Sequence, residues 1–125
     1  MTLKEVREIA ERKKAIRKRK NSRQKGARGE REVAHVLQAL GLAAYRGQQF
    51  RGGTDSPDVV CPDLPHIHFE VKLVHGGDKT MYKWLEQAIG DAGEKVPVVV
   101  HRSYAREWIA ILPFDQFLKL VTHAL

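Results

Sequence analysis

The stretch HIHFEVK, residues 66–72, alternates polar and apolar residues with the period of two that is typical of a β-strand. Its three apolar residues fall on one face of such a strand, and Glu70 and Lys72 fall together on the other. A strand that packs into a core seldom carries two opposite charges on one face without a reason. The fold must therefore cover the apolar face and leave Glu70 and Lys72 close enough to act on one shared ligand.

Four further segments have strand composition and are bounded by Gly, Pro or Asp: LAAYR, PDVVC, VPVVVHR and EWIAIL, residues 42–46, 57–61, 96–102 and 107–112. Apolar residues at helical spacing predict four helices: one over residues 2–20, one with a stripe from Val33 to Leu40 and Gly41 as the stop, one from Met81 to Ala88, and one from Phe114 to Val121. The segment NSRQKG, residues 21–26, is predicted to be a hinge between the first two helices. This order predicts an α/β domain with a mixed five-stranded sheet flanked by helices and an N-terminal basic helical extension.

The second predicted helix has a defined inner face. Val33, Val36, Leu37 and Leu40 follow the spacing of one helical stripe, and Glu30 lies on its border, so that it points partly inward. A glutamate in the first turn of a helix can simply be stabilised by the helix dipole, and this alternative stays open.

Positive charge is confined to the N-terminal part of the chain. Residues 1–31 contain 13 Lys or Arg and 4 Glu, a net charge of +9, whereas residues 32–125 contain 9 basic and 11 acidic residues, a net charge of −2. This distribution favours nucleic acid as the partner; an anionic membrane surface and a merely solvated helix are the alternatives. The candidate phosphate contacts are Lys13, Lys14, Arg17, Lys18, Arg19, Lys20, Lys25, Arg28, Arg31, Arg46 and Arg51.

Several classes of protein are disfavoured. The chain has 125 residues, one Cys and no apolar run long enough for a membrane span or a secretory signal, which predicts a single cytoplasmic domain in a prokaryotic cell or a phage-infected host. There is no G-x-S-x-G elbow and no P-loop. Cys61, His66 and His68 do not make up a four-ligand zinc site.

Asp58 begins the PDVVC segment at the end of the glycine-rich loop RGGTDSPD. If this strand pairs with residues 66–72, Asp58 and Glu70 converge at one edge of the sheet and supply the one or two carboxylates that Mg²⁺ usually takes from a protein. Asp55 becomes the ligand in a shifted register, and Asp58 is favoured by its place in the strand. Lys72 is then expected to orient the attacking water and neutralise charge on the phosphate, and His68 is expected to share this face and touch the DNA backbone.

Pro57-Asp58 followed by Glu70-Val71-Lys72 resembles the PD-(D/E)xK nuclease signature, and KGARGERE, residues 25–32, is similar to the opening helix motif of the archaeal-type Holliday junction resolvases. The resemblance implies a restriction-endonuclease-like core over residues 25–125, with residues 1–24 as an added basic arm. It implies a metal site of Asp58, Glu70 and the Val71 carbonyl, with Glu30 contacting the metal or its water and Lys72 as the catalytic lysine. It also implies a glutamine near the site, for which Gln87 is the candidate.

For function, the resemblance implies a Mg²⁺-dependent endonuclease, with Mn²⁺ expected to substitute, that acts on branched DNA and cuts four-way junctions as a C2 homodimer. Two alternatives stay open. One is another PD-(D/E)xK nuclease of restriction, repair or fork-processing type, and the other is a DNA-binding module without catalysis.

Overall fold

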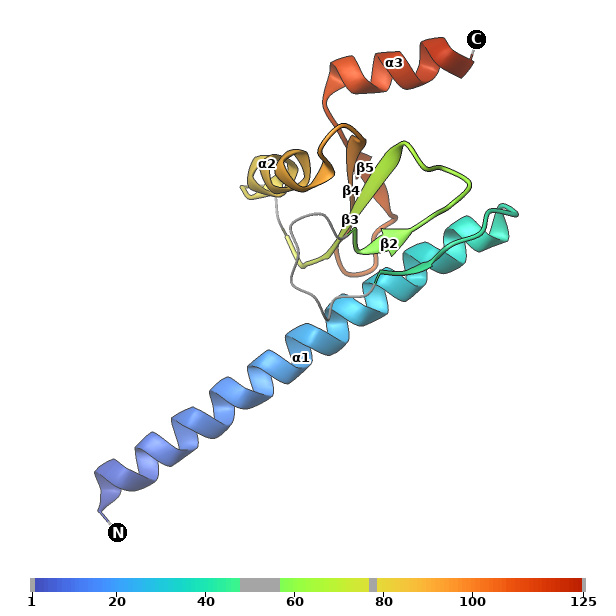
Figure 1. Cartoon of the computed structure of the whole chain (residues 1–125). Coiled ribbons are helices and arrows are strands. Elements are labelled where there is room, and N and C mark those ends of the chain that lie inside the picture. The colour runs from blue at the N-terminus through green and yellow to red at the C-terminus, as the bar shows by residue number, and fades with distance from the viewer. Residues whose placement is uncertain (1, 48–56, 77–78, 125) are drawn as a thin grey trace.

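The computed structural model describes residues 2–47, 57–76 and 79–124, without the side chains of residues 16–25 and 124. Within these residues a five-stranded sheet lies between helices, and one helix extends far beyond it (Figure 1). The elements are α1 (Leu3–Ala39), β1 (Tyr45–Arg46), β2 (Val59–Val60), β3 (Ile67–Leu73), α2 (Met81–Ala92), β4 (Val96–Arg102), β5 (Ile109–Ile111) and α3 (Phe114–Ala124). The five predicted strands and the last two predicted helices are confirmed.

The first two predicted helices are one helix, so the predicted hinge at residues 21–26 is wrong. Helix α1 is continuous over 37 residues, and its N-terminal half projects away from the sheet (Figure 1). Its start is fixed by a capping box, in which the Thr2 side chain accepts from the Glu5 N–H and the Glu5 side chain accepts from the Thr2 N–H. Its end is at the predicted place, because Gly41 adopts a φ of +85° and its N–H bonds to the carbonyl of Gln38.

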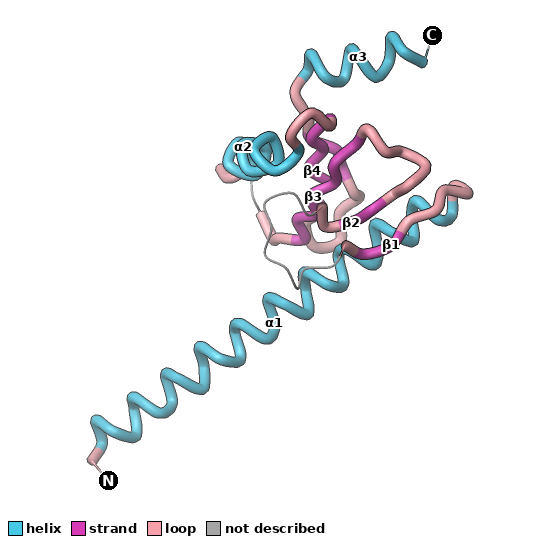
Figure 2. The backbone as a smooth tube through the Cα atoms, in the orientation of Figure 1, coloured by secondary structure: helices cyan, strands magenta, loops and turns pink. Residues whose placement is uncertain are grey.

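The sheet is mixed, with strands in the order β1-β2-β3-β4-β5; Figure 2 labels the first four strands and Figure 1 labels β5. Strands β3 and β4 are parallel and are connected through α2, whereas the other neighbouring pairs are antiparallel. Strand β2 pairs with β3 only at Val59 and Phe69, so the end of β3 that carries the Glu-x-Lys sequence extends beyond β2. This arrangement is the restriction-endonuclease-like fold that the sequence predicted.

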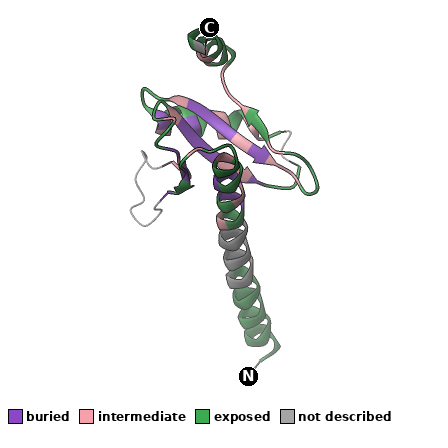
Figure 3. Cartoon of the chain, turned by 90° about the vertical axis from the view of Figure 1, so that its right-hand side faces the viewer, coloured by how far each residue is buried: buried purple, intermediate pink, exposed green. Residues whose placement is uncertain are grey.

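The two faces of the sheet have different coverings. Phe69 and Val98 face α1 and pack with Val33 and Ala34 in the main core. On the other face Val99 is fully buried, together with Ala88 of α2. Burial is concentrated in the two central strands, and the distal part of α1 is exposed (Figure 3). The alternation in β3 therefore separates an apolar core face from the face that carries Glu70, as predicted.

The inner stripe of α1 is rotated from the predicted one. Val36 and Leu40 are 50% and 74% exposed, whereas Ala34 is buried. Gly29 explains the shift, because a Cβ atom at this position would lie 3.0 Å from the Cβ of Leu73 on β3. The small residues Gly29 and Ala34 let the helix approach the sheet closely, and larger side chains turn toward solvent. None of the helices in the described ranges is both long and apolar enough to cross a membrane.

Helix α3 lies apart from the sheet at the far end of the molecule from the arm (Figure 1). Phe114, Phe117, Leu118 and Val121 form one helical stripe and are between 41% and 69% exposed. The amphipathic pattern that predicted this helix therefore has no covering for its apolar side among the described residues of the chain.

Among the glycines that the structure describes, Gly47 has the tightest surroundings. A Cβ atom built on Gly47 would overlap the backbone carbonyl oxygen of Pro57. We expect Gly47→Ala to lower the free energy of unfolding by about 1–3 kcal/mol, because β1 and β2 must separate to admit the methyl group. Gly90→Ala is the control: this helical position has no neighbour within 4 Å, and alanine should stabilise the helix by about 0.5–1 kcal/mol. Denaturant unfolding measures both, and equal stability of the two variants would contradict the prediction.

Candidate active site

Two backbone hydrogen bonds, one to β3 and one to the residue after β1, hold Asp58 at the edge of β3. Its N–H donates to the carbonyl of Phe69 at 3.0 Å, and its carbonyl accepts from the N–H of Gly47 at 2.9 Å. Its side chain also reaches β3, where Oδ2 accepts a hydrogen bond from the N–H of Val71 at 2.8 Å. Asp58 is therefore fixed beside the Glu-x-Lys sequence.

The carboxylate of Asp58 lies among other carboxylates. Burial raises the pKa of Asp58 most, the hydrogen bond from Val71 lowers it, and the charge and hydrogen bond of Glu70 and the charge of Glu30 raise it, so that the pKa reaches about 7 from an ordinary value of 3.8. Glu70 is itself only 4% exposed. Three acidic side chains thus influence one another in a region with little water, where a bound cation would offset their repulsion.

Glu30 points inward from α1, as its place on the helical wheel predicted, and is 5% exposed. Its Oε2 accepts a hydrogen bond from Nε of Arg46 on β1 at 2.9 Å. Arg46 was a candidate phosphate contact, and this ion pair engages one edge of its guanidinium group. The ion pair between buried Glu30 and partly exposed Arg46 therefore joins α1 to β1 next to Asp58.

His68 is too deeply buried to contact the DNA backbone, because its side chain is only 1% exposed. Its Nε2 instead lies 2.8 Å from Oε1 of Glu70. Both residues are on the same face of β3, since they are two positions apart. His68 thus fixes one oxygen of Glu70, and the predicted role as a phosphate contact is wrong.

Lys72 continues the same face of β3. Its Nζ donates to Oε1 of Gln87 on α2 at 3.4 Å, so the glutamine that the resemblance implied lies next to the lysine. In the register of β3 and β4, Lys72 is paired with His101, whose Nδ1 lies 2.9 Å from the carbonyl oxygen of Lys72. Because a carbonyl oxygen only accepts, Nδ1 of His101 is the donor.

The donor atoms near Asp58 fit a hard divalent cation. The described part of the chain has no group of three or more His, Cys, Asp or Glu side chains that could hold a metal ion. Mg²⁺, however, takes one or two carboxylates and fills its other positions with carbonyl and water oxygens. Asp58 and Glu70 supply two carboxylates, and the carbonyl of Val71 points to the same edge of β3 as its N–H, which Asp58 binds. These oxygens suit Mg²⁺ better than a metal that prefers nitrogen or sulfur.

The predicted phosphate contacts fall into three groups. Lys13, Lys14, Arg28 and Arg31 lie on α1 and are exposed, and Arg28 pairs with Glu32 at 3.3 Å. Arg46 is 39% exposed beside the candidate site. The rest fall outside the described side chains, together with the alternative metal ligand Asp55: Arg17, Lys18, Arg19, Lys20, Lys25 and Arg51.

Sequence reasoning missed two features around the site. His101 stands beside Lys72, which only the pairing of β3 with β4 reveals. Glu32 binds Nη2 of Arg102 at 2.9 Å and thereby ties α1 to the end of β4. Partial burial would raise the pKa of Glu32, but hydrogen bonds and charge from Arg102 and Arg28 lower it overall. Arg102 also lies 5.3 Å from the centre of the Trp108 ring.

The chain matches a family of known sequences. Residues 21–124 match the model of a family described as "Phage putative PDDEXK endonuclease". The match covers Glu30, Asp58, Glu70 and Lys72, and it leaves out the first 20 residues of the chain. No curated protein and no solved structure matches the chain.

Proposed function

The chain belongs to this family of phage PDDEXK endonucleases, and we propose that it is a metal-dependent, structure-selective DNA endonuclease that resolves four-way junctions by paired phosphodiester hydrolysis. Membership makes it an endonuclease of the PD-(D/E)xK superfamily. The proposal is supported by one observation above all. The N–H of Val71 donates a hydrogen bond to the Asp58 carboxylate, which brings Asp58 next to Glu70 and Lys72.

Asp58, Glu70 and the carbonyl of Val71 would hold Mg²⁺, and Mn²⁺ is expected to substitute. When bound, the ion supplies a Lewis acid that polarises the phosphate and offsets the charge developing on its oxygens. The surrounding residues keep these donors in position. His68 fixes one oxygen of Glu70, and the backbone bonds on both sides of Asp58 fix its carboxylate.

Lys72 is the residue that acts on the substrate directly. Its ammonium group, held by Gln87, is available to a phosphate oxygen and stabilises negative charge as the attacking water adds to phosphorus. Glu30 is supported by Arg46 and adds to the negative potential that draws a cation to the site. The products would be a 5′-phosphate and a 3′-hydroxyl, which leave a nick that can be sealed in DNA recombination or repair.

Selectivity for junctions is supported by the likeness of residues 25–32 to the opening helix of the archaeal-type resolvases and by the exposed basic helix. A four-way junction is resolved by two symmetric cuts, and a C2 homodimer provides two sites related in that way. The exposed apolar stripe of α3 is the surface through which we expect the two subunits to pack, because burial of apolar side chains stabilises a dimer. Sedimentation tests this point: Phe117→Glu should yield monomers, whereas Gln116→Glu, beside the stripe, should leave the dimer intact.

Cleavage assays test the proposal directly. An immobile four-way junction and a linear duplex that shares one arm sequence are incubated with Mg²⁺ or with EDTA. We expect paired nicks in opposite strands of the junction with Mg²⁺ and no cutting of the duplex. Equal cutting of both DNAs would point to a general PD-(D/E)xK nuclease, and tight binding without any cutting would point to a binding module.

His68 gives a separate prediction about metal affinity. His68→Leu removes the group that fixes Glu70, and partners of metal ligands commonly contribute about 10–100-fold to metal affinity or activity. We expect the Mg²⁺ concentration for half-maximal cleavage, and the dissociation constant for Mn²⁺ in calorimetry, to rise by about this factor. His66→Leu is the control, because His66 is exposed. Unchanged metal affinity in a folded His68→Leu variant would show that the contact with Glu70 is only structural.

A further inference from the structure

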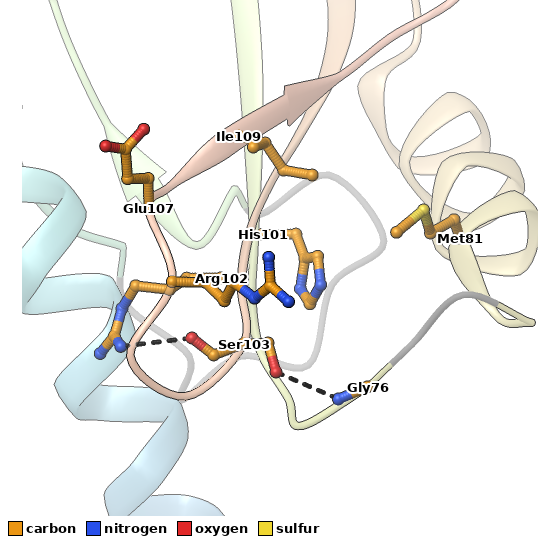
Figure 4. A pocket seen from close by; sticks show the side chains of 8 residues that line it. Gly76, Met81, His101, Arg102, Ser103, Glu107 and Ile109 are labelled. Carbon is orange, nitrogen blue, oxygen red and sulfur yellow. Dashed lines mark hydrogen bonds between the residues drawn. The ribbon is translucent and has the colours of Figure 1, made fainter.

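A cavity of about 610 Å³ lies at one end of the sheet, between the start of α2 and the turn that joins β4 to β5 (Figure 4). Met81 lines it from the helix, His101 and Ile109 from the strands, and Ser103 and Arg106 from the turn. None of these residues was singled out by the sequence motifs. The cavity is separate from Asp58 and Glu70, which do not line it.

The cavity begins next to Lys72. His101 pairs with Lys72 across the parallel strands, and Ile109 pairs with His101 across the next antiparallel pair. The three residues form one row across β3, β4 and β5, and their side chains share the face that α2 covers. Because neighbouring strands are about 4.8 Å apart, the cavity starts one strand spacing from the lysine.

His101 is the buried polar group of this cavity and is 4% exposed. Its Nδ1 donates to the carbonyl of Lys72, and its ring packs against Trp84 with ring centres 4.7 Å apart. These two contacts fix the ring, whose other nitrogen, Nε2, has no partner among the described residues. Because Nδ1 carries the ring proton, Nε2 is the hydrogen-bond acceptor of this ring.

Among the described residues that line the cavity, Ser103 and Arg106 offer free donors. Ser103 Oγ accepts a hydrogen bond from the N–H of Gly76 at 3.2 Å, which leaves the hydroxyl proton available (Figure 4). Arg106 is exposed and forms no ion pair with a described residue. Arg102 is committed to Glu32, and the carboxylate of Glu107 is directed away from His101 (Figure 4). The free donors thus suit a ligand that only accepts, with Met81 and Ile109 as an apolar wall.

We infer that this cavity binds a sugar–phosphate unit of DNA next to the cleaved bond, an inference that rests on the proposed endonuclease function. Arg106 and the Ser103 hydroxyl bind the phosphate, and the apolar wall contacts the deoxyribose. Nε2 of His101 accepts from a water molecule that also donates to the phosphate. Each strand of DNA carries one phosphate for about 3.4 Å of helix axis. A cavity one strand spacing from Lys72 therefore holds a phosphate one or two nucleotides from the one that Lys72 faces.

The test measures binding in EDTA to a series of four-way junctions, each with a single uncharged methylphosphonate at one position near the branch point. Arg106→Gln is compared with Lys95→Gln, which removes the same charge at the opposite, exposed end of β4. We expect Arg106→Gln to weaken binding on the order of tenfold and to reduce the salt slope by about one, and Lys95→Gln to change neither. One methylphosphonate position should weaken binding by the wild type and have no further effect on Arg106→Gln.

Additive effects of Arg106→Gln and of every methylphosphonate position would overturn the inference, as would equal effects of Arg106→Gln and Lys95→Gln. Cleavage of the same junctions with Mg²⁺ separates this result from the fate of the proposed function. Coupling at one phosphate without any cleavage would support the cavity and overturn the endonuclease. Cleavage without coupling would overturn the cavity alone, and a wild type that binds no junction would overturn both.

Discussion

Asp58→Asn is expected to reduce the rate of junction cleavage by about 10³-fold or more, since charge stabilisation by a metal ion contributes several kcal/mol to such a reaction. Asparagine has nearly the same shape, and its carbonyl can still accept the hydrogen bond that Val71 donates to Asp58. The substitution therefore removes a negative charge with little change to the backbone. We expect junction binding in EDTA to be unchanged or tighter, because one carboxylate no longer repels the DNA.

Cleavage and binding are measured on the same immobile junction, and Asp55→Asn is the matched variant. Asp55 lies three residues earlier and outside the described residues, and it would be the ligand if the register were shifted. Loss of cleavage in Asp58→Asn alone would assign the site to Asp58, whereas loss in Asp55→Asn alone would assign it to Asp55. Full cleavage by both variants would exclude either aspartate as a metal ligand.

Asp58→Asn is also predicted to change the stability of the metal-free protein. The pKa of the Asp58 carboxyl is raised from 3.8 to about 7 in the folded protein, so the folded state holds its proton over a pH range in which the unfolded state has lost it. The contribution of Asp58 to the free energy of unfolding therefore falls as the pH rises from 3.8 to about 7. Asp58→Asn should be more stable than the wild type at pH 8, with a difference that shrinks toward pH 4. Thermal unfolding in EDTA measures this, and Mg²⁺ should stabilise only the wild type.

The sequence predicts most of the fold because the determining patterns are local. Alternation in residues 66–72 is enough to assign β3 and to separate its core face from Glu70 and Lys72. The hinge at residues 21–26 was wrong for a local reason too. Arg, Gln and Lys are good helix formers, and one glycine costs about 1 kcal/mol in a helix, which does not end a helix that is well formed on both sides.

The unpredicted part of the site depends on contacts between distant segments. Strand alternation assigns His68 and Glu70 to one face but does not show that their side chains bond or that both are buried. His101 lies next to Lys72 only because β3 and β4 pair in parallel in one register. The ion pair between Glu30 and Arg46 likewise requires α1 to lie against β1. In each case the residue types were visible in the sequence, but their partners were not.

Deletion of residues 1–23 is expected to weaken junction binding strongly and to flatten its dependence on salt. The segment contains 10 Lys or Arg and 3 Glu, and its described part is exposed along α1. If the whole complex neutralises about six to ten phosphates, affinity should fall by about 10³- to 10⁵-fold between 50 and 200 mM salt. For every phosphate that the arm neutralises, its deletion should reduce the slope of log affinity against log salt by about 0.9.

The arm also carries apolar residues, so its charge and its apolar stripe must be tested separately. Leu3, Val6 and Ile9 are 78%, 48% and 39% exposed and could pack against a second subunit. Lys13→Gln with Lys14→Gln should reduce the salt slope and leave the sedimentation coefficient unchanged if the arm lies on DNA. If the arm instead joins two subunits, Leu3→Ser with Val6→Ser should lower the sedimentation coefficient and leave the salt slope unchanged. An unchanged salt slope after deletion of residues 1–23 would exclude binding of the arm to DNA, and loss of the dimer in the same variant would assign it to the subunit interface.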